Sequence, residues 1–125
     1  MAPSDQHVLS TEIVDAGVPV VRVTGELDIS TVAHLCRAVA DAATGAARKP
    51  PRLVIDLMAL DFCDSSGLRG LIGAVKEVHV LGGKAVLAVE RGGMLDRLLD
   101  LSGLREFLRV TDTVDAAVER LRARS

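Results

Sequence analysis

Residues 53–68 read LVIDLMALDFCDSSGL, and this stretch decides the fold. Its first five residues are apolar at consecutive positions apart from Asp56, a pattern typical of a strand buried on both faces of a parallel sheet. Ser65 or Ser66 then begins a helix, because serine is a common N-terminal capping residue and the apolar stripe that follows has helical spacing. That stripe is Leu68, Leu71, Ile72, Val75 and His79.

Strands and helices alternate on both sides of this unit. The sequence predicts strands at residues 7–14, 18–23, 53–57, 84–90 and 107–110. It predicts helices at about 31–43, from 65 or 66 to 79, at 94–101 and at 114–121. This order predicts an α/β fold with a mostly parallel mixed sheet, an N-terminal antiparallel hairpin and about four helices. We expect one domain over residues 1–125, with a loose tail at about residues 1–6.

The composition argues against several classes of partner. Lys plus Arg is 15 and Asp plus Glu is 17, so the formal charge is −2, which argues against bulk nucleic-acid binding and a polybasic membrane anchor. The chain has two Phe and no Tyr or Trp, so we expect an aliphatic core and no aromatic platform for stacking bases.

The cysteines and the N-terminal segment suggest a reducing compartment. Cys36 and Cys63 stand alone, without the spacing of a disulfide framework or a zinc site. The chain shows no signal-peptide pattern and no apolar run of the roughly 18 residues that a membrane span needs. We therefore expect a soluble cytoplasmic protein that does not bind a membrane.

The strongest candidate for a functional site is residues 61–68. They follow the buried strand and begin a helix, and ligands of open parallel sheets are displayed at such positions. A helix N-terminus has free N–H groups and partial positive charge, so a phosphate on Ser65 or Ser66 would be tolerated there. The alternative is that Asp64 or Ser65 only caps the helix.

The glycines of the same helix also allow two interpretations. Gly67, Gly70 and Gly73 recur every third residue, and an interior glycine costs roughly 1 kcal/mol relative to alanine. Either this low ridge packs tightly against the sheet, or it forms a bare surface near Ser65 on which another protein lies.

Four acidic residues end strands or begin helices, and we expect them to lie on one rim of the sheet. Their oxygens are ligands that suit a divalent cation, but capping by Asp28 and Asp64 is the favoured explanation. If these acids cluster, a phosphate on Ser65 would act by repulsion and by blocking a docking surface. The four residues are Glu26, Asp28, Asp61 and Asp64.

No catalytic pair is evident. The three histidines are far apart in sequence, and Cys63 precedes Asp64, whose charge opposes thiolate formation. An enzyme is therefore the weakest of the possible functions.

Several motifs, taken together and in order, resemble the STAS domain of anti-sigma factor antagonists. They are Gly25-Glu26-Leu27-Asp28, Ile55-Asp56-Leu57, the run from Phe62 to Leu68, Gly82-Gly83-Lys84, and Leu101-Ser102-Gly103-Leu104. The resemblance covers about residues 7–123.

The resemblance implies a regulator that switches partners. In that family the unphosphorylated protein binds an anti-sigma factor, itself a serine kinase, and so frees a sigma factor without touching DNA. Phosphorylation ends the complex, and a serine phosphatase restores the active form. By motif position the phosphoacceptor is Ser65, and no cofactor or metal is implied. The partner-binding residues are Asp28, Asp64, Ser66, Gly67, Leu68 and Arg69.

The same resemblance leaves a second function open. A STAS module also serves in transporters and in stress-signalling assemblies without a sigma-factor role. The genomic neighbourhood discriminates between the two, because a gene for a small ATP-binding kinase favours the first function and a transporter operon favours the second.

Overall fold

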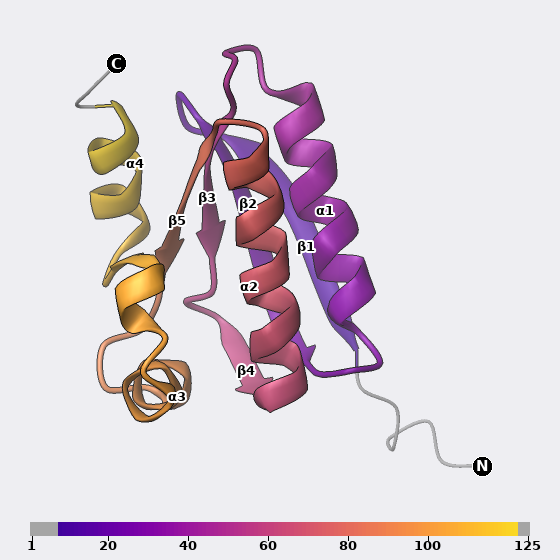
Figure 1. Cartoon of the computed structure of the whole chain (residues 1–125), viewed down its shortest axis with the longest axis vertical. Coiled ribbons are helices and arrows are strands. Elements are labelled where there is room, and N and C mark those ends of the chain that lie inside the picture. The colour runs from indigo at the N-terminus through magenta and orange to yellow at the C-terminus, as the bar shows by residue number, and fades with distance from the viewer. Residues whose placement is uncertain (1–7, 123–125) are drawn as a thin grey trace.

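The computed structural model describes residues 8–122, and a six-stranded mixed sheet lies at the centre of this part of the chain (Figure 1). The strand order is β1-β2-β3-β5-β6, and β4 pairs with the C-terminal end of β2. Strands β1 and β2 form the antiparallel hairpin, and every other pair is parallel, as the sequence predicts. The strands are β1 (Leu9–Asp15), β2 (Pro19–Leu27), β3 (Arg52–Asp56), β4 (Leu60–Cys63), β5 (Lys84–Ala88) and β6 (Arg109–Thr111).

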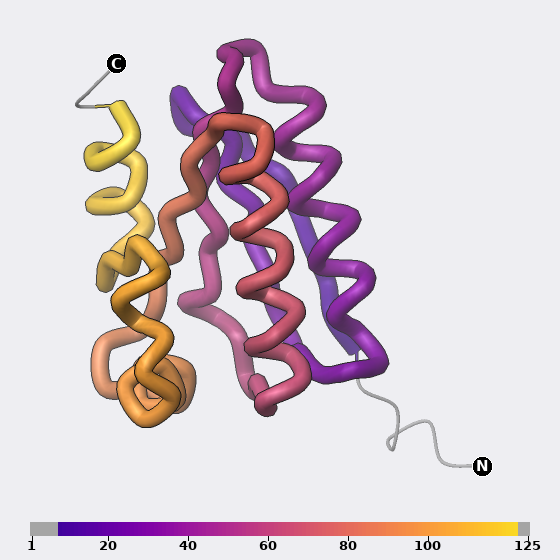
Figure 2. Tube along the Cα trace, viewed as in Figure 1, coloured from indigo at the N-terminus to yellow at the C-terminus, as the bar shows by residue number. Residues whose placement is uncertain are grey.

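Helices cover both faces of the sheet (Figure 2). Helices α1 (Val32–Gly45) and α2 (Ser65–Val80) lie side by side on one face. Helix α4 (Val114–Arg122) packs on the other face, and α3 (Met94–Ser102) follows β5. The predicted helices agree with these bounds to within two residues. None of the helices described between residues 8 and 122 is long and apolar enough to cross a membrane.

The core is aliphatic and is divided by the sheet. Because side chains alternate along a strand, Leu53 and Ile55 of β3 face α1 and α2, whereas Val54 faces α4. All three are fully buried, which explains the consecutive apolar residues of this strand. The two phenylalanines lie outside the core, with Phe62 37% and Phe107 73% exposed.

The region before α2 differs from the prediction. Strand β2 continues to Leu27, beyond the predicted end at residue 23, through a register shift at Gly25. Gly25 has φ +104°, and a Cβ there would lie 2.2 Å from the Val8 carbonyl oxygen, so glycine is needed. The short strand β4 was not predicted, since four residues show too little alternation to be recognised. The candidate site therefore follows β4, not the central strand directly.

The C-terminal strand is also shifted. Residues 105–107 form a short 3₁₀ helix, and β6 begins only at Arg109, so the predicted strand at 107–110 starts two residues too early. The predicted tail at residues 1–6 lies outside the described residues.

Candidate functional site

The N-terminus of α2 is capped by Asp64. The Asp64 carboxylate accepts a hydrogen bond from the Gly67 N–H at 2.8 Å, and the Asp64 carbonyl accepts one from the Leu68 N–H at 2.9 Å. Asp64 has an extended backbone, so Ser65 is the first helical residue. The capping role therefore belongs to Asp64, and the exposed Ser65 hydroxyl has no capping function.

The loop between β2 and α1 is held together by Asp28, which is only 4% exposed. Its carboxylate accepts hydrogen bonds from the Ser30 N–H at 2.9 Å and the Ser30 hydroxyl at 2.7 Å. The Thr31 hydroxyl oxygen accepts from the Asp28 N–H at 3.0 Å and donates to the Glu26 carbonyl at 2.7 Å. These hydrogen bonds hold the loop between β2 and α1 in one conformation. Asp28 thereby fixes the place at which α1 begins.

Strand pairing brings the Asp28 loop and the start of α2 together. Leu27 is the register partner of Cys63, and the Asp64 N–H donates to the Leu27 carbonyl at 3.3 Å. Asp28 and Asp64 directly follow these two strand residues, so they lie at one edge of the sheet. The sequence predicted that these two acidic residues lie on one rim of the sheet, and the pairing of β4 with β2 supplies the physical cause.

The other predicted site residues differ in exposure. Ser65 and Arg69 are exposed, Ser66 is half-buried, and Gly67 and Leu68 are buried. Of these residues, Ser65 and Arg69 therefore lie at the surface of α2. Direct contact of Gly67 and Leu68 with a partner stays a prediction, and in the folded chain they hold the helix against the interior.

Two of the three glycines in α2 are required by packing. A Cβ on Gly67 would lie 2.3 Å from the Leu27 carbonyl oxygen, and one on Gly70 would lie 2.0 Å from Val32 Cγ2. A Cβ on Gly73 would meet nothing within 4 Å. The packing interpretation therefore holds for Gly67 and Gly70, although they pack against the end of β2 and against α1, not against the sheet face.

Two of the four acidic residues have structural roles. The hydrogen bond from the Gly67 N–H confirms that Asp64 caps α2. Asp28 does not cap α1, because Thr31 is at that N-cap and the Asp28 carboxylate accepts its hydrogen bonds from Ser30 in the turn before the helix. Within the described residues, no group of three or more His, Cys, Asp or Glu side chains is arranged to hold a metal ion.

Cys63 lies beneath the site with its thiol protected. Burial, together with the charge of Asp64, raises the pKa of this thiol to about 12. The Cys63 Sγ–H donates to the Asp64 carbonyl at 3.5 Å. The thiol therefore stays protonated at neutral pH, in agreement with the prediction that it is not a nucleophile.

Exposed apolar side chains near the site were missed by the sequence analysis. Ile29 follows Asp28 and is 76% exposed, and Met94 at the start of α3 is 42% exposed. Met94 also borders a shallow groove of about 350 Å³, which Cys63 and Leu101 line from β4 and α3. The sequence does carry a signal for one of these exposed apolar residues. Ile29 is an apolar residue in a polar turn, between Asp28 and Ser30.

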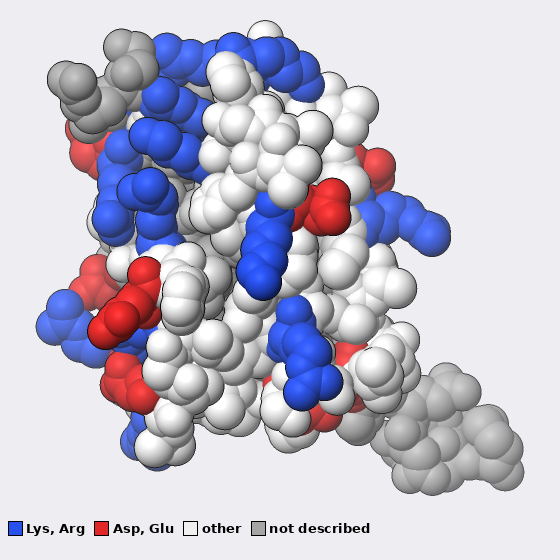
Figure 3. Space-filling model, in the orientation of Figure 1, with Lys and Arg blue, Asp and Glu red and all other residues white. Residues whose placement is uncertain are grey.

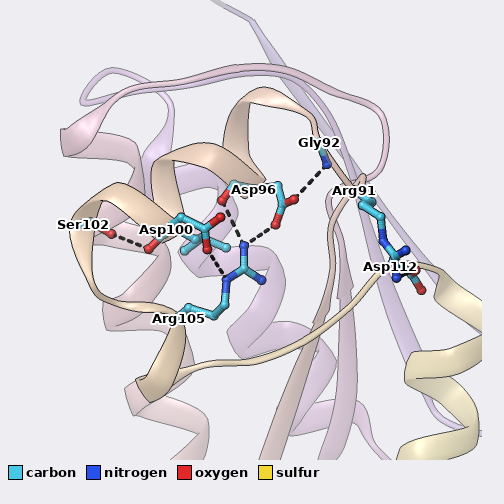
Figure 4. A network of polar contacts seen from close by, with 8 residues as sticks. Arg91, Gly92, Asp96, Asp100, Ser102, Arg105 and Asp112 are labelled. Carbon is cyan, nitrogen blue, oxygen red and sulfur yellow. Dashed lines mark hydrogen bonds and ion pairs between the residues drawn. The ribbon is translucent and has the colours of Figure 1, made fainter.

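A polar network holds the segment after β5 (Figure 4). Arg105 bridges Asp96 and Asp100, and Arg91 pairs with Asp112 at 2.8 Å. A hydrogen bond from the Gly92 N–H, with Arg105 beside it, lowers the pKa of Asp96. These charges line a cavity of about 480 Å³, and because they already form ion pairs they have a clear structural role.

Comparison with known proteins identifies the family. The family model of the STAS domain matches residues 11–117. The anti-sigma F factor antagonist of Paenibacillus polymyxa is 36% identical over 104 residues, which cover 82% of this chain and 86% of that protein.

Solved structures support the same family. The crystal structure of an anti-sigma factor antagonist from Mycobacterium paratuberculosis superposes with a TM-score of 0.77 at 30% identity, and 97% of each chain is covered. The phosphorylated form of the Bacillus cell fate determinant SpoIIAA superposes with a TM-score of 0.62 at 25% identity, over 92% of this chain and 100% of that one. With its mixed sheet, its β4–α2 junction and this match over most of its length, the chain belongs to the STAS-domain family of anti-sigma factor antagonists.

Proposed function

We propose that this protein is an anti-sigma factor antagonist whose binding is switched by phosphorylation of Ser65. The unphosphorylated form binds an anti-sigma factor that is also a serine kinase, and so frees a sigma factor. The observation that carries the proposal is the exposed Ser65 side chain at the first position of α2, beside a cap that Asp64 supplies. A kinase gains access to this hydroxyl without disturbing the helix.

The surroundings of Ser65 suit a protein partner. Ile29 and Met94 expose apolar surface near the edge at which α2 begins, and Arg69 adds a charged group one turn further along the helix. Apolar side chains surrounded by polar ones are typical of surfaces that bind proteins. Asp28 supports this surface from within by fixing the loop that carries Ile29.

A phosphate on Ser65 is compatible with the fold. Asp64 satisfies the Gly67 N–H, and the N–H groups of Ser65 and Ser66, at the first two helical positions, have no intrahelical acceptor. They and the helix dipole favour an anion at this position, whereas Asp64 disfavours it. We therefore expect the phosphorylated protein to stay folded and to lose affinity because about −1.5 to −2 charges enter the contact surface.

The test compares Ser65→Ala and Ser65→Glu in binding to the anti-sigma factor encoded near this gene. We expect Ser65→Ala to bind like the wild type and Ser65→Glu to bind over a hundredfold more weakly, which corresponds to about 3 kcal/mol. Ser10→Glu, at an exposed serine of β1, adds the same charge elsewhere and should bind normally.

Incubation with the kinase and ATP, followed by mass spectrometry, locates the phosphate. Phosphate on another residue, or equal binding of the Ser65→Ala and Ser65→Glu variants, would contradict the proposal that Ser65 is the switch. A serine phosphatase that removes the phosphate and restores binding would complete the cycle.

The relatives described above favour this function over a STAS module of a transporter or of a stress-signalling assembly. Both the Paenibacillus and the Mycobacterium proteins are anti-sigma factor antagonists, and each is matched over most of its length.

A further inference from the structure

We infer that a basic groove at the end of the sheet opposite Ser65 binds a small multivalent anion with phosphate or carboxylate groups. The groove has a volume of about 190 Å³ and lies between the start of the parallel strands and the end of α4. Its lining residues are Arg52, Lys84, Val86, Arg109, Arg120 and Leu121. No acidic residue is among them.

The strand topology concentrates the positive charge. Arg52, Lys84 and Arg109 are the first residues of β3, β5 and β6, three neighbouring parallel strands. Arg52 and Lys84 are register partners, so their side chains leave the same face of the sheet on strands about 4.8 Å apart. Arg120 approaches from the last turn of α4. Figure 3 shows Lys and Arg side chains gathered on the side of the molecule that α4 occupies.

Three of these cations form no ion pair within the part of the chain that the structure describes. The ion pairs found within residues 8–122 use Arg22, Arg91 and Arg105, and none of them includes Lys84, Arg109 or Arg120. Like charges placed on adjacent strands destabilise a sheet, so this arrangement costs stability in the absence of an anion.

The C-terminus of α4 explains only part of the cluster. Arg52 donates a hydrogen bond to the Leu121 carbonyl at 2.8 Å, and Arg120 lies in the last turn, where a cation complements the helix dipole. That dipole is equivalent to roughly half a negative charge. It does not offset the charges of Lys84, Arg109 and Arg120, and it gives no reason for Lys84 and Arg109 to converge on the same groove.

The dimensions of the groove favour a small ligand over an extended polyanion. A volume of about 190 Å³ holds a few phosphate or carboxylate groups, and the apolar floor of Val86 and Leu121 excludes water beneath them. The net charge of −2 for the whole chain disfavours wrapping by nucleic acid. Arginine offers paired N–H donors that match both phosphate and carboxylate oxygens.

The experiment is a thermal unfolding titration of the full chain with sodium tripolyphosphate and, separately, with sodium citrate. Sodium chloride at matched ionic strength serves as the reference. We expect one of the two anions to give a saturable rise in melting temperature, of about 10 °C at 100 times its Kd. The anion that acts at the lower concentration identifies phosphate or carboxylate as the preferred group.

Two double variants locate the site. Lys84→Gln with Arg109→Gln should abolish the anion effect and raise the melting temperature without anion, because the mutual repulsion is removed. Arg37→Gln with Lys76→Gln removes the same charge from exposed positions on α1 and α2 and should leave the effect intact. Amide chemical shifts of residues 84 and 109 provide a second readout that does not depend on stability.

Three outcomes would overturn the inference. They are a response no larger than that to sodium chloride, an equal response in both double variants, and binding to heparin without binding to either small anion.

Discussion

The approach of α2 to α1 depends on Gly70, and this dependence can be measured with a single methyl group. In Gly70→Ala the new Cβ would lie 2.0 Å from Val32 Cγ2, 3.1 Å from Val32 Cβ and 3.3 Å from Val32 Cγ1. Rotation of the Val32 side chain does not relieve the contact, because its Cβ and both of its methyl groups are close. Valine in a helix is also confined to one main rotamer. The two helices must therefore move apart.

The magnitude follows from two opposing contributions. Alanine is favoured over glycine within a helix by about 1 kcal/mol, whereas overpacking in a well-packed region costs about 1–3 kcal/mol. Since no side-chain rotation relieves the contact, we expect the upper part of that range and a net loss of about 1–2 kcal/mol for Gly70→Ala. Gly73→Ala has no atom within 4 Å of its new Cβ and should gain about 1 kcal/mol.

Thermal unfolding followed by circular dichroism gives the assay. With an unfolding entropy of about 2.1 cal/mol/K per residue, 125 residues give about 0.26 kcal/mol/K, so 1 kcal/mol corresponds to about 4 °C. Gly70→Ala should melt about 4–8 °C below the wild type, and Gly73→Ala about 4 °C above it. Adding Val32→Ala to Gly70→Ala should recover part of the loss, with a coupling energy of about 1–2 kcal/mol in a double-mutant cycle.

Equal stabilisation by Gly70→Ala and Gly73→Ala would refute this reasoning. It would mean that the distance between α1 and α2 adjusts freely and that the contact with Val32 does not set it. A loss in Gly70→Ala that Val32→Ala does not recover would place the strain elsewhere.

The remaining predictions concern titrating groups. Because the pKa of the Cys63 thiol is about 12, iodoacetamide at pH 8 should leave Cys63 unmodified in the folded protein and alkylate it in urea; rapid native alkylation, located by peptide mapping, would contradict this. The pKa of Asp96 is lowered by Gly92 and Arg105, so its contribution to stability is complete above its unfolded pKa of about 3.9 and is lost as the pH falls through the lower folded value. Arg105→Gln should therefore destabilise the protein at pH 6, with a deficit against the wild type that shrinks in urea titrations below pH 4; a deficit independent of pH would show that this ion pair is not its origin.

Much of the fold follows from the sequence, because its long elements carry strong patterns. The consecutive apolar residues Leu53–Ile55 predict a strand buried on both faces, and the stripe of α2 predicts that helix to within one residue. Strand β4 is different. It has only four residues, and its pairing depends on Gly25, whose left-handed conformation becomes evident only when β1 is beside it.

For the candidate site, the sequence left open which of two adjacent residues caps α2. Asp64 and Ser65 are adjacent and both are common capping residues, so local chemistry does not decide which of them caps α2. The hydrogen bond from the Gly67 N–H to Asp64 decides it. Likewise, the sequence gives no reason to pair Gly70 with Val32, because that contact exists only once α1 and α2 lie side by side.

The division of roles between Asp64 and Ser65 has a consequence for how the protein can change. Because Asp64 caps the helix, a change at Ser65 should alter the free energy of unfolding only slightly. Under the proposed switch, a phosphate can therefore be attached to and removed from Ser65 through many cycles while the stability of the fold stays nearly constant. The proposed switch therefore exposes the two adjacent positions to different evolutionary pressures, with stability acting on residue 64 and partner binding on residue 65.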